Sequence, residues 1–136
     1  KGKTFEQYGQ PPAFLLVADD ILGGLFAING GAFGQDDLGQ IYYLAPDTLS
    51  WEPMNCGYSE FVCWTLEGDI DLFYEPYYWK GWQEEVAKLN GNQVFSFFPF
   101  LWTKEGQQIE AVSRKVVPIE ESYRLTMDMQ RQLLEK

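Results

Sequence analysis

The residues best suited to chemistry are carboxylates, which cluster near the middle of the chain. The cluster comprises Glu67, Asp69, Asp71 and Glu75. If this stretch is helical, Glu67, Asp71 and Glu75 share one face, because residues four apart are neighbours on a helix. Like charges so placed repel, so they need solvent, a cation or a basic partner. The cluster therefore indicates a solvated face, a protein-binding face or a magnesium or calcium site.

An aromatic run follows the carboxylates. Tyr77, Tyr78 and Trp79 stand directly after Pro76. Such residues anchor protein interfaces when they are exposed and cover the core when they are buried. We predict one partner-binding group that combines acids and aromatics: Glu67, Asp69, Asp71, Glu75, Tyr77, Tyr78 and Trp79.

The rest of the sequence offers few catalytic groupings. It contains no histidine, which removes the usual Ser/His and Cys/His pairs and the commonest zinc ligand. It has no P-loop, and its acids lack the spacing of an EF-hand calcium loop. We therefore predict no catalytic residue, no metal ligand and no cofactor.

The acidic residues are concentrated in the first part of the chain. The formal net charge is −10 and the pI is about 4.3. Twelve Asp and Glu but no Lys or Arg lie between Thr4 and Trp79, whereas from Lys80 onward eight basic residues balance eight acidic ones. This field repels nucleic-acid phosphates and anionic membranes and attracts basic proteins. We predict a basic protein partner, no nucleic acid and no membrane; the oligomeric state is left open.

A glycine-rich stretch from 18 to 34 is predicted to form a corner on which the other elements pack. The apolar runs 14–17 and 25–28 are typical of strands, and Asp20 begins the turn between them. A second turn signal at 29–31 is expected to place Gly30 at positive φ. The predicted structural turn residues are Gly23, Gly24, Asn29, Gly30, Gly31 and Gly34.

The remaining pattern mixes strands and helices. Strands are predicted at 40–45, 49–52, where Pro53 ends the strand, and 109–117, with an apolar run interrupted by Pro99 at 94–102. Helices are predicted at 59–67, capped by Ser59, at 82–89 and at 119–134. We predict a single α+β domain over residues 13–136, a mostly antiparallel twisted sheet of about five or six strands with two main helices packed on it. Residues 1–12 are expected to be an entry loop, the remainder of a longer N-terminal region.

The two cysteines indicate the cellular compartment. Cys56 and Cys63 are both predicted to lie in helical conformation, seven residues apart. Seven residues of helix rise by about 10.5 Å, beyond the Cα separation of roughly 4.4–6.8 Å that a disulfide tolerates. We therefore expect reduced thiols and a cytoplasmic location.

Several segments resemble an uncharacterised bacterial family that is classed as a domain of unknown function. The resemblance is carried by AFLLVADDILGGLFAINGGAFG, IYYLAPDTLSWEP, GYSEFVCW, GDIDLFYE and FPFLWTKEG, and it covers the chain from Pro12 to Pro118. It implies a further N-terminal region and assigns no functional residue. The strand that ends at 29–31, followed by a strand, a tryptophan and an aromatic helix, also resembles the SUKH superfamily. Many of those α+β domains are immunity proteins against secreted bacterial toxins.

Three functions follow from these patterns. The first is a non-enzymatic binding protein, of immunity type, whose acidic and aromatic half meets a basic protein such as a nuclease toxin. The second is a cation-dependent hydrolase or lyase that uses Asp69, Asp71 and Glu75. The third is a structural module whose function lies in a missing N-terminal region.

Overall fold

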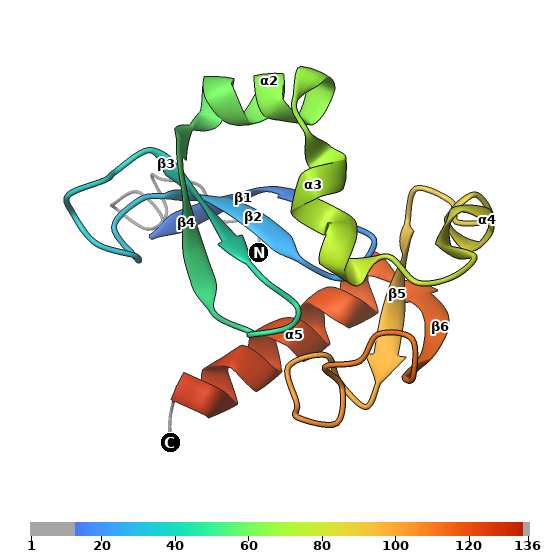
Figure 1. The fold of residues 1–136 in the computed structure, drawn as a ribbon. Coiled ribbons are helices and arrows are strands. Elements are labelled where there is room, and N and C mark those ends of the chain that lie inside the picture. Colours follow the sequence, from blue (N-terminus) through green and yellow to red (C-terminus); the bar gives the residue numbers. More distant parts are fainter. Residues whose placement is uncertain (1–12, 135–136) are drawn as a thin grey trace.

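The described part of the chain, residues 13–134, forms two β-sheets that are joined and covered by helices (Figure 1). In this computed structural model the first sheet has four strands and the second has two. The α+β class is confirmed. The single sheet of five or six strands is wrong, because among the described residues the last two strands pair only with each other. The predicted entry loop over residues 1–12 lies outside the described residues.

The first sheet is an antiparallel meander in the order β1-β2-β3-β4. Its strands are β1 (Phe14–Asp19), β2 (Leu25–Asn29), β3 (Gln40–Leu44) and β4 (Trp51–Gly57). The central strand β2 is covered on both faces, which explains its continuous apolar sequence. Phe26 of β2 lies opposite Tyr43 of β3, and their rings stack with centroids 4.5 Å apart.

Both outer strands of this sheet are irregular. β1 carries a bulge between Leu16 and Ala18, where its register against β2 shifts. The prediction that Pro53 ends the fourth strand is wrong, because β4 continues through Pro53 to Gly57. Proline is tolerated there since β4 is an edge strand of the described sheet, so one side of it needs no hydrogen-bond donors.

The second sheet is a hairpin of β5 (Gln93–Phe98) and β6 (Ser113–Pro118). The strand predicted from Ile109 begins only at Ser113, because turns occupy the preceding residues. The N–H of Phe95 donates a hydrogen bond of 2.7 Å to the carbonyl of Ile21. This bond joins the hairpin to the β1–β2 turn.

The helices differ in length and position. They are α2 (Tyr58–Glu67), α3 (Ile70–Tyr74), the 3-10 helix η1 (Glu75–Tyr77), α4 (Trp82–Val86) and α5 (Ile119–Leu134). The predicted closing helix at 119–134 is confirmed as α5, which crosses below the four-stranded sheet in Figure 1. α3 runs from the end of α2 toward the hairpin. It therefore leads the chain from one sheet to the other.

Two predictions near the start of α2 are wrong. Ser59 does not cap the helix, because α2 begins at Tyr58 and Gly57 is its N-cap. The Glu60 carboxylate accepts a hydrogen bond of 3.1 Å from the N–H of Gly57 and so satisfies this end of the helix. Cys56 lies in β4 and not in a helix with Cys63. Both thiols are free.

Two apolar cores fill the space between these elements. The first lies between the four-stranded sheet and α2, and its buried residues are Phe26, Ile41, Tyr43, Ala45 and Phe61. The second lies against the hairpin, and its buried residues are Leu22, Trp79, Phe95, Phe97, Leu101 and Val112. Tyr74, Tyr77 and Trp82 pack against the second core. The segment from α3 to α4 therefore covers the hairpin.

The turn after β2 is organised by a buried asparagine. Asn29 is 1% exposed; its Oδ1 accepts hydrogen bonds from the N–H groups of Gly31 and Phe33, and its Nδ2 donates to the carbonyl of Gly34. Positive φ occurs at Gly31 (+124°) and not at Gly30, so that prediction is wrong by one residue. The Asn29 amide holds the loop in this form, because it pairs with backbone groups that would otherwise lack partners.

The β1–β2 turn requires glycine at two positions for different reasons. Gly23 has a φ of +87°, which side-chain-bearing residues rarely adopt. Gly24 provides space instead, since a Cβ there would lie 2.7 Å from the Asp20 Oδ2 and closer still to the Tyr43 hydroxyl.

We predict that Gly24→Ala destabilises the fold by about 1–3 kcal/mol, because the added methyl group overpacks the contact between Asp20 and Tyr43. The matched control is Gly91→Ala, whose Cβ would meet nothing within 4 Å. The control should change the free energy of unfolding by less than about 0.5 kcal/mol. Urea denaturation of both variants measures the difference, and equal midpoints would contradict the prediction.

Candidate functional site

The predicted carboxylates do not share one helical face. Glu67 is the last residue of α2, and the helix stops at Gly68. Asp69 then caps α3, so the following acids belong to α3 and η1. The expected helical face through Glu67, Asp71 and Glu75 is therefore wrong, because one helix ends and another begins within the cluster.

Two of these acids support local structure. The Asp69 Oδ1 accepts a hydrogen bond of 3.1 Å from the N–H of Leu72, which caps α3. The Asp71 Oδ1 accepts a hydrogen bond of 2.7 Å from the Tyr78 hydroxyl. Within residues 13–134, no three His, Cys, Asp or Glu side chains lie close enough together to hold a metal ion. That part of the chain therefore gives the cation-dependent alternative no geometric support.

The carboxylates lie next in sequence to exposed leucines. Leu66 at the end of α2 is 78% exposed, and Leu72 in α3 is 68% exposed. We refer to this exposed set as the acidic surface; its residues are Leu66, Glu67, Asp69, Asp71, Leu72 and Glu75. Protein-binding surfaces combine exposed apolar side chains with a polar or charged rim, and the acidic surface contains both kinds of residue.

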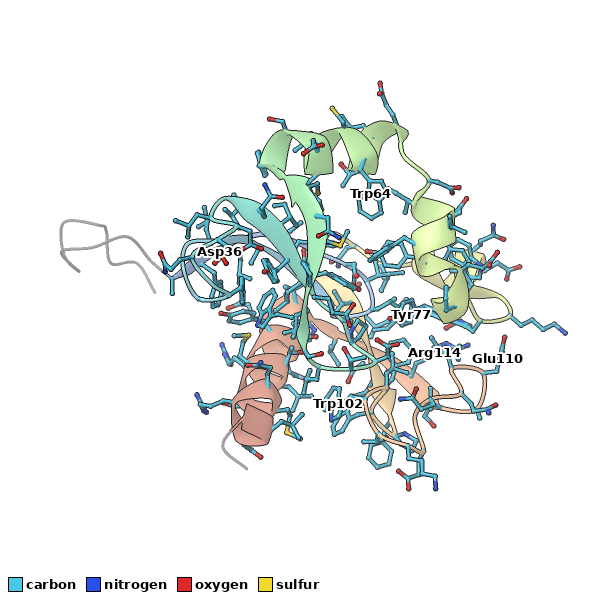
Figure 2. The ribbon with its side chains drawn as sticks, turned by 60° about the vertical axis from the view of Figure 1, so that its left-hand side comes forward. Asp36, Trp64, Tyr77, Trp102, Glu110 and Arg114 are labelled. Atoms are coloured by element: carbon cyan, nitrogen blue, oxygen red, sulfur yellow. The ribbon has the colours of Figure 1, made fainter. Side chains whose placement is uncertain are left out.

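A pocket of about 250 Å³ lies next to the acidic surface. We call it the aromatic pocket; its lining is Asp20, Ile21, Leu22, Tyr74, Tyr77, Tyr78, Trp79 and Trp82. It brings together Tyr77 and Tyr78 of the predicted partner-binding group. Figure 2 shows Tyr77 at the end of α3 nearest the hairpin, on the opposite side of the molecule from Asp36.

Trp79 is wrongly predicted as an interface residue. It is only 3% exposed, and its ring packs edge to face against Phe95 and Phe97 of β5. An aromatic residue surrounded in this way belongs to the core. Trp79 therefore forms part of the pocket wall but cannot anchor a protein partner on the surface.

The other aromatic rings are held in defined orientations. The rings of Tyr78 and Trp82 stack with centroids 4.0 Å apart and an interplanar angle of 5°. The rings of Tyr74 and Tyr77 have centroids 6.4 Å apart and are inclined by 60°. All four side chains are half-buried, so they are fixed by packing but remain partly accessible.

The Asp20 carboxylate holds one side of the pocket together. Its Oδ2 accepts hydrogen bonds from the hydroxyls of Tyr43 at 2.6 Å and Tyr74 at 2.8 Å. Its Oδ1 accepts hydrogen bonds from the N–H groups of Leu22 at 3.0 Å and Gly24 at 2.7 Å. One carboxylate therefore links the β1–β2 turn, β3 and α3, and all of its usual acceptor positions are used.

The tyrosine hydroxyls around the pocket remain protonated. Burial raises the pKa of Tyr43 and of Tyr74 far above the ordinary value, and the negative charge of Asp20 adds to the effect. Burial also raises the pKa of Tyr77, with a further contribution from Asp47. The pKa of Tyr78 rises to about 12 through desolvation and its hydrogen bond to Asp71. Near neutral pH these hydroxyls therefore donate hydrogen bonds and add no charge.

An ion pair fixes the segment that closes the pocket. The Arg114 Nε and Nη2 donate to the two carboxylate oxygens of Glu85, at 2.8 and 2.5 Å. The Trp79 Nε1 donates to Glu85 as well, at 3.0 Å, and the Arg114 guanidinium lies 4.5 Å from the centroid of the Trp79 ring. These contacts hold α4 against β6. Chiefly the hydrogen bonds from Arg114, and then that from Trp79, lower the pKa of Glu85 to about 2.

Five residues of the pocket lining have no predicted site role, and the polar or aromatic ones among them are Asp20, Tyr74 and Trp82. Asp20 was predicted only as a turn residue and Trp82 only as part of a helix, and Tyr74 had no predicted role. Trp82 lies in the same aromatic run as Tyr78, so the run itself was a usable signal. No pattern in the sequence links Asp20 to Tyr74, because 54 positions separate them.

Comparison with protein families matches residues 1–122 to the model of the protein of unknown function DUF2625. The chain belongs to this family. The predicted membership is therefore confirmed, whereas the SUKH resemblance finds no support among the matches. No solved structure matches the chain.

Two bacterial proteins are similar to most of the chain. The uncharacterized protein YbfG of Escherichia coli (strain K12) is 48% identical over 115 residues, which are 85% of this chain and 51% of that protein. An uncharacterized protein of Haemophilus influenzae is 44% identical over 121 residues, which are 89% of this chain and 53% of that protein. The chain thus spans about half the length of these relatives.

In the part that the structure describes, no helix has the length and apolar character needed to cross a membrane.

We predict that the ion pair between Glu85 and Arg114 stabilises the fold and that this stabilisation is lost in the acid pH range. The pKa of Glu85 falls from 4.5 to about 2 on folding, so its contribution is complete above pH 4.5 and is lost as the pH falls toward 2. Glu85→Gln should therefore melt at a lower temperature than the wild type above pH 4.5, and the difference should shrink toward pH 2. Thermal melting across this range measures the effect. Glu84→Gln is the control, since it leaves the ion pair intact; a constant difference between Glu85→Gln and wild type at every pH would refute the prediction.

Proposed function

We propose that the chain is a binding module whose acidic surface recognises a basic protein. The observation that carries this proposal is the arrangement of Leu66 and Leu72, which are 78% and 68% exposed, among four exposed carboxylates. An interface combines apolar contacts with a polar or charged rim, and the two leucines and four carboxylates supply both. The arrangement therefore favours a protein-binding face over a solvated one.

The charge distribution supports the same proposal. Twelve acidic residues and no basic residue lie between Thr4 and Trp79, and the acidic surface belongs to that part of the chain. A surface of this sign speeds the approach of a positively charged partner and disfavours negatively charged ones. Tyr77 and Tyr78 lie next to the surface and supply large, partly accessible aromatic area.

We further propose that the module is of immunity type. Its partner would then be a basic toxin, such as a nuclease, whose positive nucleic-acid-binding surface meets the acidic surface in the cytoplasm. The SUKH-like order of elements in the sequence motivates this choice, and so do the free thiols of Cys56 and Cys63, which are usual in a reducing compartment.

We predict that replacing Asp69 and Asp71 together by Asn slows association with the partner by about tenfold at low salt and preserves the fold. Asparagine keeps the acceptor oxygens that cap α3 and receive the Tyr78 hydroxyl, so only charge is removed. The partner is isolated by affinity capture from the native host and identified by mass spectrometry. Surface plasmon resonance then measures its association and dissociation rates with the wild-type chain and with the double variant. Retention of no basic protein by the wild-type chain at low salt would refute the proposal.

Two further variants sharpen this measurement. Leu72→Ala should speed dissociation rather than slow association, because an apolar contact acts at short range. Glu105→Gln with Glu121→Gln removes the same number of charges from exposed positions elsewhere in the chain, and it should leave both rates near wild type. An equal effect of the control pair on association would show that overall charge, and not the acidic surface, is responsible.

A further inference from the structure

The aromatic pocket has the dimensions and chemistry of a small binding site. Its volume of about 250 Å³ lies just below the roughly 300–1,000 Å³ typical of sites for drug-sized ligands. Five of its lining residues are aromatic: Tyr74, Tyr77, Tyr78, Trp79 and Trp82. A pocket of this size suits a small ligand or a single chemical group.

The charge near the pocket favours a cation. Among residues 13–134, those that line the pocket include the carboxylate of Asp20 and no lysine or arginine. Asp71 lies behind Tyr78 and accepts the hydrogen bond of its hydroxyl, which adds negative charge just outside the wall. The nearby guanidinium of Arg114 is balanced by both carboxylate oxygens of Glu85. The field inside the pocket therefore has the sign that attracts a positive group.

The hydrogen bonding selects among cations. All four usual acceptor positions of Asp20 are filled, by the hydroxyls of Tyr43 and Tyr74 and the N–H groups of Leu22 and Gly24. An ammonium or guanidinium group would lose its hydration and find few free acceptors, and unpaired donors are costly. A quaternary ammonium group has no N–H donor and so avoids this cost.

We propose that the aromatic pocket binds a quaternary ammonium group. Aromatic ring faces attract such cations, and the attraction strengthens in a desolvated site. Five aromatic residues line the cavity, and their rings have more than one orientation, since Tyr74 and Tyr77 are inclined by 60° and Tyr78 and Trp82 are stacked. The inference goes beyond the proposed protein-binding function and does not depend on it.

The first test compares the binding of two ligands that have the same shape but differ in charge. Choline is titrated against the whole chain, and binding is followed by tryptophan fluorescence and by the indole N–H resonances. Neohexyl alcohol, in which carbon replaces the choline nitrogen, is titrated in parallel. Choline should bind at least about tenfold more tightly than the alcohol. Equal affinities would show an ordinary apolar pocket and would overturn the proposal, as would the absence of any choline binding.

Two variants locate the site and control for folding. Trp82→Leu should weaken choline binding by about tenfold or more, since it removes one wall. Trp102→Leu is the matched control; it removes a half-buried tryptophan that stacks on Phe100 outside the pocket, and it should bind choline as the wild type does. An equal loss in both variants, or unchanged binding in Trp82→Leu, would overturn the assignment. If Trp82→Leu fails to fold, Tyr77→Leu takes its place, and the comparison of choline with neohexyl alcohol needs no variant.

A final comparison identifies the source of the group. Choline represents a free small molecule, and a short peptide that contains trimethyllysine represents a protein-borne group; the same peptide with unmodified lysine is its control. Tighter binding of either trimethylammonium compound than of the lysine peptide supports the proposal and names the source. Tighter binding of unmodified lysine would overturn it. Loss of choline binding would leave the proposed basic partner unaffected, because the acidic surface variants test that interaction separately.

Discussion

The fold depends on one carboxylate that accepts hydrogen bonds from three separate parts of the chain. Asp20 accepts hydrogen bonds from the hydroxyls of Tyr43 in β3 and Tyr74 in α3. Two N–H groups of its own turn donate to its other carboxylate oxygen. Removal of any donor would leave a partly buried charge with an unfilled acceptor, which costs more than an average hydrogen bond contributes. The same carboxylate therefore fixes the glycine turn, the position of α3 and the shape of the aromatic pocket.

The sequence predicted local elements well where the pattern was periodic. The amphipathic repeat after Pro118 predicted the helix α5 that the structure describes at Ile119–Leu134. The sequence was less informative where distant segments decide the outcome: nothing in the run 94–117 shows that β5 and β6 pair with each other rather than with β4. Pro53 was read as a strand end, although its effect depends on whether the strand lies at an edge, and that is a property of the whole sheet.

The candidate site could be predicted only in part for a related reason. The acids and aromatics at 67–79 are adjacent in sequence, so composition alone drew attention to them. Their division into an exposed surface and a pocket depends on the break at Gly68, on the burial of Trp79 beneath Arg114, and on Asp20 from a remote turn. Tertiary packing decides each of these, because local sequence does not determine which face of a short helix meets the core.

The irregular outer strands of the four-stranded sheet have a consequence for self-association. An open sheet edge offers unpaired donors and acceptors to any extended chain, which is a common route to aggregation. Here the β1 edge is distorted by the bulge at Leu16 and Ala18, and the β4 edge lacks a donor at Pro53 and turns to positive φ at Asn55. In the sheet formed by residues 13–57, neither edge is a straight template for a further strand, so this meander resists growth into a continuous sheet between molecules.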